Sequence, residues 1–390
     1  MTPTGAADRY DVIVVGLGAM GSAAAWRLAR RGLRVLAFDS YTPPHTLGST
    51  HGRSRIIREA YFEHPSYVPF VRRAYELWEE TEVDAGQQLL LRTGGLMIGR
   101  PDGEIVSGAL ASAREHDIEH ELISADELRR RYPVLVPARD MVGVLEKRAG
   151  VLYPEQCIQS HLRLAMHAGA GLRLNERIES WSADSSRVEV RTASGGTHHA
   201  DRLVIAAGPW ASELLQEHDV PLEVERQLMA WFDPMEGEGF GPQQCPIAVW
   251  DDPDGCAFAT FPDLGDGVKI AIHHAGETTN PRDVDRTPRP ADEAATRKLL
   301  ARFLPAANGT LREAAVCLYT NTPDQHFIID HLGESRRVVL ASPCSGHGFK
   351  FASAVGEAVA ALVMDEPPPV DISLFRLDRF RSTAASGQGG

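Results

Sequence analysis

The clearest chemical pattern in the sequence is a glycine triplet, Gly16, Gly18 and Gly21, spaced as G-x-G-x-x-G. The first glycine permits a tight turn, the second lets the backbone approach a pyrophosphate, and the third allows a helix to pack closely on a strand. Asp39 follows about twenty residues later, where a carboxylate can accept hydrogen bonds from the hydroxyls of an adenosine ribose. No arginine directly follows Asp39, which disfavours NADP. These residues predict a dinucleotide site, and the pattern alone does not separate FAD from NAD.

The elements around the glycines form one βαβ unit. Residues 10–15 are a short, mostly β-branched apolar run, typical of a strand buried on both faces of a parallel sheet. The alanine-rich residues 22–31 have helical spacing, Gly32 is placed to end that helix, and residues 34–38 predict a second strand. Strand, glycine turn, helix and acid therefore follow one another in the order that a dinucleotide-binding fold requires.

Composition excludes several classes of protein. The 390 residues are 43% hydrophobic and 24% charged, which is typical of a compact globular chain with two domains. The formal net charge of −13 opposes nucleic-acid binding, and an acidic chain must hold an anionic ligand with a few local Arg or Lys residues. No apolar stretch approaches the ~18 residues of a membrane span, and the first ten residues lack the pattern of a signal peptide. We expect a cytoplasmic protein.

Several reactive side chains have ordinary structural interpretations as well. The five cysteines are widely spread without a C-x-x-C pair, which predicts free thiols and no metal site. From composition alone, Cys317 is a small buried hydrophobic residue, Lys269 an edge lysine in an apolar strand, and Arg58 one arginine of a basic patch. Residues 274–292 are rich in Gly, Pro, Asp and Glu, which predicts a surface loop.

Besides the glycine triplet, several short stretches distributed along nearly the whole chain match the sequence motifs of one enzyme family. They are Gly48-Ser-Thr-His-Gly52, Arg55-Ile-Ile-Arg58, Gly150-Val-Leu152, Val204-Ile-Ala-Ala-Gly208, Cys317-Leu-Tyr319 and Ser345-Gly-His-Gly-Phe-Lys350. Through them the chain resembles the monomeric sarcosine oxidase and N-methyltryptophan oxidase family of the D-amino acid oxidase superfamily. The resemblance implies an α/β and α+β fold, with a Rossmann-like FAD-binding domain interleaved with a substrate domain that contains a mixed β-sheet.

The resemblance also implies domain boundaries and an activity. Residues 1–85, 150–215 and 320–390 would form the FAD-binding domain, and residues 86–149 and 216–319 the substrate domain. Members of the family oxidise N-methyl and related secondary amino acids, giving an imine that hydrolyses to an amine and an aldehyde while O2 is reduced to H2O2. We expect a monomer that acts on a small amino acid, with no nucleic-acid or membrane partner.

The resemblance assigns roles to individual residues. It implies that Cys317 forms a thioether to the 8α-methyl group of the flavin, and that Arg58 and Lys350 hold the substrate carboxylate, which answers the problem posed by the net charge. Lys269 would assist the transfer of electrons to oxygen, with Arg55 as its companion over the flavin ring. His273 and Tyr319 match residues of the active-site pocket. The implied cofactor-binding residues are Gly16, Gly18, Gly21, Asp39, His51, Cys317, Gly346 and Gly348, and no metal is implied.

The sequence departs from the sarcosine oxidases in the pocket wall. Phe258 and Ala259 stand where that subfamily carries a pair of tyrosines, in an alignment that needs one insertion and a nearby deletion. With Trp231 in the same domain, this predicts a larger or differently shaped substrate than sarcosine, such as N-methyltryptophan, pipecolate or a fructosyl amino acid.

Two other functions are alternatives to an oxidase. One is a flavin-linked amino acid dehydrogenase that does not use oxygen, and Lys269 argues against it because an oxygen-activating lysine has no purpose there. The other is a flavin-binding protein without catalytic activity. The joint presence of Arg58, Lys269, Cys317 and Lys350 argues against this second alternative.

Overall fold

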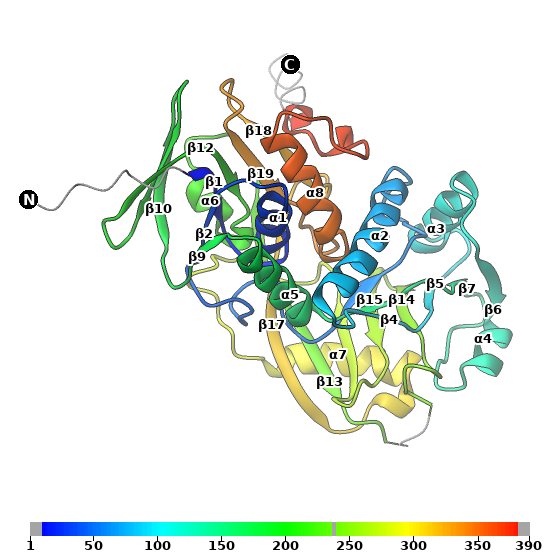
Figure 1. Ribbon diagram of the computed structural model, residues 1–390. Coiled ribbons are helices and arrows are strands. Elements are labelled where there is room, and N and C mark those ends of the chain that lie inside the picture. The colour runs from blue at the N-terminus through cyan, green and yellow to red at the C-terminus, as the bar shows by residue number, and fades with distance from the viewer. Residues whose placement is uncertain (1–9, 236–238, 381–390) are drawn as a thin grey trace, which may run out of the picture.

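The computed structural model describes residues 10–380 except 236–238, so most of the segment on which the signal-peptide expectation rests lies outside the described residues. Two eight-stranded sheets and one three-stranded sheet make up its β-structure (Figure 1). Within these described ranges, no helix is both long and apolar enough to span a membrane.

The first large sheet contains the predicted dinucleotide unit. Its parallel part joins β9, β2, β1, β12 and β19, while β10, β11 and β18 add antiparallel pairs. The strands are β1 (Tyr10–Val15), β2 (Val35–Phe38), β9 (Gly171–Arg173), β10 (Ile178–Ala183), β11 (Val188–Thr192), β12 (Thr197–Ile205), β18 (Ile328–Leu332) and β19 (Val338–Ser342).

The βαβ unit forms as the sequence predicts, with one shift. Helix α1 (Ala19–Arg30) begins directly after the glycine turn, three residues before the predicted start at Ser22, because Gly18 already serves as its N-cap in an extended conformation. Gly32, after the end of the helix, has a φ of 86°, a left-handed conformation that favours glycine. Strand β1 is buried over its last four residues, Val12 to Val15, and therefore on both faces, which explains its continuous apolar run.

Helices cover one face of this sheet. Helix α1 packs against both α5 (Pro154–His167) and α8 (Ala352–Val363), and α2 (Tyr67–Ala85) lies against α5 and α8 (Figure 1). Gly356 of α8 allows the closest approach, since an added Cβ would lie 2.7 Å from the carbonyl carbon of Ala23 in α1. The small residues of the two helices therefore hold α8, and the segment that precedes it, close to the dinucleotide turn.

The second large sheet has the order β17-β13-β16-β15-β14-β5-β7-β6 and is mixed, because only β14 and β5 pair in parallel. Helix α7 contacts β13 and β16, and α3 contacts β5, β14 and β7. The elements are β5 (Gly95–Gly99), α3 (Glu104–Glu115), β6 (Glu121–Ser124), α4 (Ala125–Arg131), β7 (Val142–Glu146), β13 (Glu223–Phe232), β14 (Ile247–Asp252), β15 (Cys256–Phe261), β16 (Val268–Ile272), α7 (Pro290–Phe303) and β17 (Leu311–Asn321).

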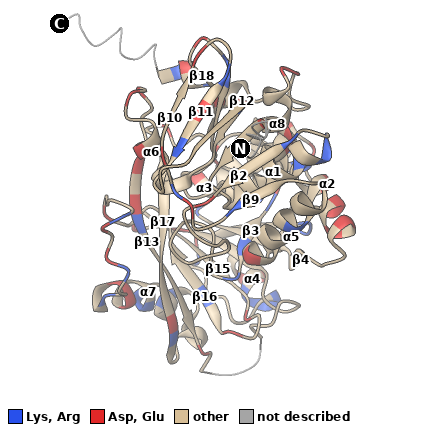
Figure 2. Ribbon diagram, turned by 60° about the vertical axis from the view of Figure 1, so that its left-hand side comes forward, with Lys and Arg blue, Asp and Glu red and all other residues tan. Residues whose placement is uncertain are grey.

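A small sheet and short helices complete the described structure. The sheet has the order β3 (Arg55–Ile57), β8 (Gly150–Leu152) and β4 (Leu90–Arg92). The short helices are η1 (Gly208–Trp210), α6 (Ala211–Leu214), η2 (Pro305–Ala307), η3 (Phe349–Phe351), η4 (Ser373–Phe375) and η5 (Leu377–Phe380). Figure 2 shows basic and acidic segments interspersed over the elements of both large sheets.

Each large sheet draws its strands from separated stretches of the chain. Those of the first sheet lie within residues 10–38, 171–205 and 328–342, and those of the second within 95–146, 223–272 and 311–321. A mainly parallel sheet beside a mixed sheet agrees with the fold class that the family resemblance implies, whereas the domain boundaries remain a prediction.

Candidate cofactor and substrate site

One cavity is lined by residues from both large sheets, and it gathers most of the residues singled out in the sequence. Of the residues to which the family resemblance assigns a catalytic, substrate-binding or cofactor-binding role, Gly21 and His51 do not line it, although both are buried. The others line the cavity and are Gly16, Gly18, Asp39, Arg55, Arg58, Lys269, His273, Cys317, Tyr319, Gly346, Gly348 and Lys350.

The glycine turn forms one part of the cavity wall. Gly16 has a φ of 91°, and a Cβ there would lie 2.5 Å from the carbonyl oxygen of Ala206, while a Cβ on Gly21 would lie 1.7 Å from the oxygen of Gly16. Gly18 has more space, since the nearest atom to an added Cβ, Thr50 Oγ1, is 3.7 Å away. Helix α1 then starts without a side-chain cap or an acidic residue in its first turn, which suits an anionic ligand.

Asp39 both shapes this turn and remains available to a ligand. Its Oδ2 accepts a hydrogen bond from the Leu17 amide at 2.7 Å, and its Oδ1 accepts one from the Tyr41 amide at 2.8 Å. Burial raises the pKa of Asp39 above its ordinary value. Because each carboxylate oxygen can accept a second hydrogen bond, Asp39 can still receive the hydroxyls of a ribose.

Unsatisfied polar atoms around the cavity indicate a ligand with many hydrogen-bonding groups. Buried polar atoms in proteins are nearly always hydrogen-bonded, yet several here have no partner. Three of these atoms belong to residues that line the cavity, namely Ser49 Oγ, Trp210 Nε1 and Thr320 Oγ1. Two others, His51 Nε2 and Arg286 Nη1, belong to residues that contact or neighbour residues of the wall without lining it. Together with the glycine turn and the uncapped helix, these atoms fit a bound dinucleotide.

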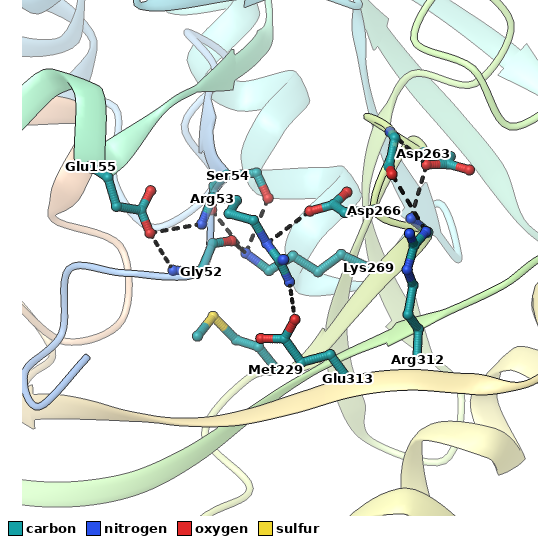
Figure 3. Close-up of polar contacts among 12 residues, drawn as sticks. Gly52, Arg53, Ser54, Glu155, Met229, Asp263, Asp266, Lys269, Arg312 and Glu313 are labelled. Carbon is teal, nitrogen blue, oxygen red and sulfur yellow. Dashed lines mark hydrogen bonds and ion pairs between the residues drawn. The ribbon is translucent and has the colours of Figure 1, made fainter. Parts of the chain in front are cut away.

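The loop that carries His51 and leads into β3 is fixed from two sides (Figure 3). Lys269 Nζ donates to the carbonyl oxygens of Gly52 and Ser54, both at 2.9 Å, and to Ser54 Oγ at 3.1 Å. From the other side, Glu155 Oε1 accepts hydrogen bonds from the amides of Gly52 and Arg53 at 2.8 and 3.1 Å. Burial and the neighbouring Arg55 lower the pKa of Lys269 well below its ordinary value. Lys269 thus joins the second sheet to the loop.

Arg55 and Cys317 meet beside this loop. Arg55 Nη2 donates to the carbonyl oxygen of Ser49 at 2.9 Å and lies 3.7 Å from Cys317 Sγ. Cys317 is buried in β17 and lines the cavity. A guanidinium is therefore placed next to the thiol that the family resemblance singles out, where it can stabilise negative charge on the sulfur.

Arg58 already has a carboxylate partner within the protein. Its Nη2 donates to both carboxylate oxygens of Glu63 at 2.8 and 2.7 Å, and its Nη1 donates to the carbonyl oxygen of Ala60 at 2.9 Å. Although burial opposes ionisation, Arg58, His347 and Lys350 lower the pKa of Glu63 to about 2. Glu63 is therefore ionised at neutral pH, and a substrate carboxylate must share Arg58 with it.

Lys350 is held near Arg58 at the start of the segment that leads into α8. Its Nζ donates to the carbonyl oxygen of His347 at 2.7 Å and to Tyr61 Oη at 3.4 Å. Burial and the charge of Arg58 lower the pKa of Lys350 to about 7. His347 Nε2 lies 3.0 Å from the carbonyl oxygen of Gln325, so Nε2 carries the proton, and Nδ1 accepts the hydrogen bond from Tyr61.

His273 and Tyr319 form a second pair in the wall. His273 Nδ1 and Tyr319 Oη lie 3.2 Å apart, and burial lowers the pKa of His273 to about 3, so the imidazole is neutral. Gly346 allows the backbone to approach both rings, since an added Cβ would lie 2.5 Å from His273 Cε1 and from Tyr319 Cε2.

Small apolar residues form part of the wall contributed by the second sheet, beside larger residues such as Met229, Phe258 and Phe261. Val249, Ala259 and Ala271 are in register across β14, β15 and β16, and all three line the cavity. Trp231 does not share this wall, contrary to the expectation that it shapes the substrate pocket. It is buried with Lys269 Nζ 5.3 Å and the Arg53 guanidinium 4.5 Å from its ring centroid.

The comparisons with known proteins decide between the dinucleotides. A family model described as FAD dependent oxidoreductase matches residues 11–362. The chain belongs to this family. The cofactor that the glycine pattern left open is therefore FAD, and the predicted fold class is confirmed.

Curated relatives of this oxidoreductase match over the whole chain. It is 43% identical to the monomeric sarcosine oxidase of Streptomyces avermitilis, over 99% of this chain and 100% of that protein. It is 38% identical to the monomeric sarcosine oxidase of Bacillus sp. strain B-0618, over 95% of this chain and 96% of that protein. The N-methyl-L-tryptophan oxidase of Yersinia pestis is 35% identical, over 95% of this chain and all of that protein.

Solved structures share the fold of the oxidoreductase. The L-proline dehydrogenase of P. horikoshii superposes with a TM-score of 0.84 at 21% identity, over 97% of this chain and 99% of that chain. A Tyr258Phe mutant of the amino acid oxidase NikD, in its open form, superposes with a TM-score of 0.84 at 23% identity, over 95% of this chain and 97% of that chain.

Sequence reasoning missed several residues of the FAD-dependent oxidoreductase site. Glu63 and the Tyr61–His347 hydrogen bond surround the two cations, and neither has a spacing that predicts such contacts. The sequence does show an acidic residue, Glu63, five positions after Arg58, but it does not show that the two side chains form an ion pair. Within residues 10–380 other than 236–238, no three His, Cys, Asp or Glu side chains are grouped as metal ligands.

Proposed function

We propose that this oxidoreductase is an oxidase of secondary α-amino acids that holds FAD covalently through Cys317 and reduces O2 to H2O2. The observation that carries the proposal is the shared cavity, which is lined by the glycine turn, the Cys317 thiol and the two buried cations Arg58 and Lys350. The names of the full-length relatives, which are sarcosine and N-methyltryptophan oxidases, support the same reaction class.

The cations account for recognition of the carboxylate. Arg58 and a protonated Lys350 carry two positive charges, and ionised Glu63 carries one negative charge, so one substrate carboxylate makes the cluster neutral. A guanidinium and an ammonium that converge on one carboxylate fix its orientation as well as its position. The α-carbon and the amine of the substrate are thereby directed toward the remainder of the cavity.

Bound FAD would supply the acceptance of a hydride equivalent from the carbon next to nitrogen and the transfer of electrons to oxygen. The protein residues provide the setting for this chemistry. Neutral His273 and its partner Tyr319 offer hydrogen bonds to an uncharged amine, and Lys269 and Arg55 provide positive potential beside the loop of residues 49–55. The imine product needs no protein nucleophile, because it hydrolyses after release.

The wall of Val249, Ala259 and Ala271 supports a substrate larger than sarcosine. These three side chains lie on the second-sheet side of the cavity and are smaller than the tyrosine that the sarcosine oxidases carry at the position of Ala259 by our alignment. We therefore favour an N-methyl α-amino acid with an apolar side chain, and comparable turnover of sarcosine with no turnover of N-methyltryptophan would contradict this choice.

Two assays test the proposal. In the first, the protein is precipitated with acid, and we expect the yellow colour to stay in the pellet of the parent and to leave the pellet of Cys317→Ala. In the second, H2O2 is measured by a coupled peroxidase over sarcosine, N-methyltryptophan, pipecolate and a fructosyl amino acid. Bleaching of the flavin by substrate without any peroxide in air would favour the dehydrogenase alternative, and absence of bleaching by every amino acid would favour a binding protein.

We further propose that the protein acts as a cytoplasmic monomer with the interleaved domain boundaries given above. The relatives that are named monomeric support the monomeric state. The separated stretches of chain in each large sheet support the interleaved domains. Sedimentation of the purified holoenzyme gives the oligomeric state, and a mass of twice 42.6 kDa would contradict a monomer.

A further inference from the structure

Residues 273–289, between β16 and α7, form a mostly exposed loop, as the sequence predicts. Two arginines of this loop nevertheless contact the first-sheet side of the molecule. Arg282 forms an ion pair with Glu213 of α6, and both residues line the cavity. Arg286 Nη2 donates to the carbonyl oxygen of Leu47 at 2.6 Å. The segment therefore connects the second sheet to the loops that follow β2 and β12.

The backbone around Arg286 is held in place by a buried arginine of β13. Arg226 Nε donates to the carbonyl oxygen of Asp285 at 2.9 Å, and its Nη2 donates to that of Thr287 at 3.0 Å. Arg226 is itself paired with Asp292 at 2.9 Å and is 4% exposed. Since both neighbours of Arg286 are fixed through their carbonyl groups, the fold presents this one side chain in a defined position.

One end of the Arg286 guanidinium has no partner. Nη2 is occupied by Leu47, whereas Nη1 is buried without a hydrogen bond. A guanidinium nitrogen that is buried and unpaired is costly, because its donors have lost water and gained no acceptor. An acceptor that is not part of the protein would remove this cost.

The surroundings of Arg286 belong to the cofactor part of the cavity. Burial lowers the pKa of Arg286, and the nearby Tyr41 and Cys317 oppose that shift. In turn, Arg286 contributes to the lowered pKa values of His45 and His51, after burial and other neighbours. Tyr41, His45 and Cys317 all line the cavity. The guanidinium thus lies among residues that come from both sides of the dinucleotide site.

We propose that Arg286 is a ligand of FAD, with Nη1 donating a hydrogen bond to an oxygen of the cofactor. A guanidinium suits a phosphate oxygen and equally a carbonyl oxygen, since both accept charge-assisted hydrogen bonds. The inference rests on FAD as the cofactor and is independent of the amine substrate and of the thioether. If Arg286 binds FAD, the loop that connects β16 of the second large sheet to α7 contributes to cofactor binding.

The test measures FAD affinity in the Cys317→Ala background, where no covalent bond can obscure the equilibrium. Apoprotein is titrated with FAD by flavin fluorescence, and we compare Arg286→Met, Arg286→Lys and the control Arg312→Met. Arg312 is half-exposed and lies 3.5 Å from Asp233 at the far end of β17. Loss of one charge-assisted hydrogen bond predicts that Arg286→Met weakens FAD binding by about 10-fold to 100-fold, while Arg312→Met leaves it unchanged.

Two further measurements identify the acceptor and separate binding from folding. If the acceptor is a phosphate oxygen, Arg286→Met also weakens ADP binding, and if it is a flavin oxygen, ADP binding is retained while riboflavin binding is lost. Arg286→Lys can still hold Leu47 with its single ammonium group, so we expect it to keep the melting temperature of the apoprotein and to lose FAD affinity. FAD affinity within twofold of the parent in both Arg286 variants would overturn the proposal.

Discussion

The ion pair between Arg58 and Glu63 leads to a prediction about substrate binding that would not follow from Arg58 and Lys350 alone. In the ligand-free protein, Glu63 occupies the guanidinium that a substrate carboxylate needs. Replacing Glu63 by glutamine removes the competing negative charge and nearly keeps the shape of the side chain. We therefore expect Glu63→Gln to bind simple carboxylates more tightly than the parent does, although it removes a group from the binding site.

The magnitude follows from the ionisation of Glu63. Its pKa falls from an ordinary 4.5 to about 2, and because one pKa unit corresponds to about 1.4 kcal/mol, its charged form gains about 3 kcal/mol from its surroundings. A ligand carboxylate that takes over part of this interaction should bind about 10-fold to 100-fold more tightly in the variant. The ligand-free variant should in turn lose up to about 3 kcal/mol of stability, since Arg58 is left buried without its partner.

The assay uses acetate, which has a carboxylate but no amine to oxidise. Acetate binding is measured from the flavin absorbance of the holoenzyme, and stability from thermal unfolding with and without acetate. Glu76→Gln is the matched control, because Glu76 pairs with Arg73 at 2.6 Å on the exposed surface of α2 with 63% side-chain exposure. If Glu63→Gln binds acetate no more tightly than the parent and the control, Glu63 does not compete for Arg58 and the reasoning fails.

Three other predictions concern the same cavity. Lys350 has a pKa of about 7 and is charged below that value, so acetate affinity should fall by at most about tenfold per pH unit above it, and the pH titration should be flat in Lys350→Met. Ala259→Tyr should fill the wall and lower kcat/KM for N-methyltryptophan by about tenfold or more while sarcosine turnover is kept, as peroxide formation will show. Gly16→Ala should destabilise the protein more than Gly255→Ala in thermal unfolding. Both positions have positive φ, but only an added Cβ at Gly16 meets backbone within 4 Å, so equal losses would contradict the role of close packing.

The local part of the structure could be predicted from the sequence, because its signals are local. The run of residues 10–15, the glycine triplet and Gly32 each report on their own backbone, and the structure confirms β1, α1 and β2 around them. Helix α1 begins three residues before its predicted start, because its first turn, although mostly buried, contains Gly21, whose low helix propensity masks the helical pattern. The fold of the remaining chain was reached through the family resemblance rather than through periodicity.

The contacts between distant segments could not be predicted. Glu63 meets Lys350 and His347 only after α8 has packed against α1 and α2, and Arg286 reaches Leu47 across 239 positions of sequence. Composition identified the segment of Arg286 as a loop, but it carries no information on what a loop lies against. Trp231 is a residue for which the prediction was wrong. Its place in the predicted substrate domain suggested a pocket residue, but the alternation of side chains along β13 directs its ring toward Lys269 and Arg53.

The placement of Cys317 and the glycine turn on different sheets has a thermodynamic consequence. A ligand that contacts Gly16 of the first sheet and Cys317 of the second is bound fully only when both sheets are folded. Its binding free energy is then lost as soon as either sheet opens, so each sheet stabilises the other through the ligand even where their own side chains do not touch. A cofactor held in the proposed way would make the two sheets unfold as a single cooperative unit.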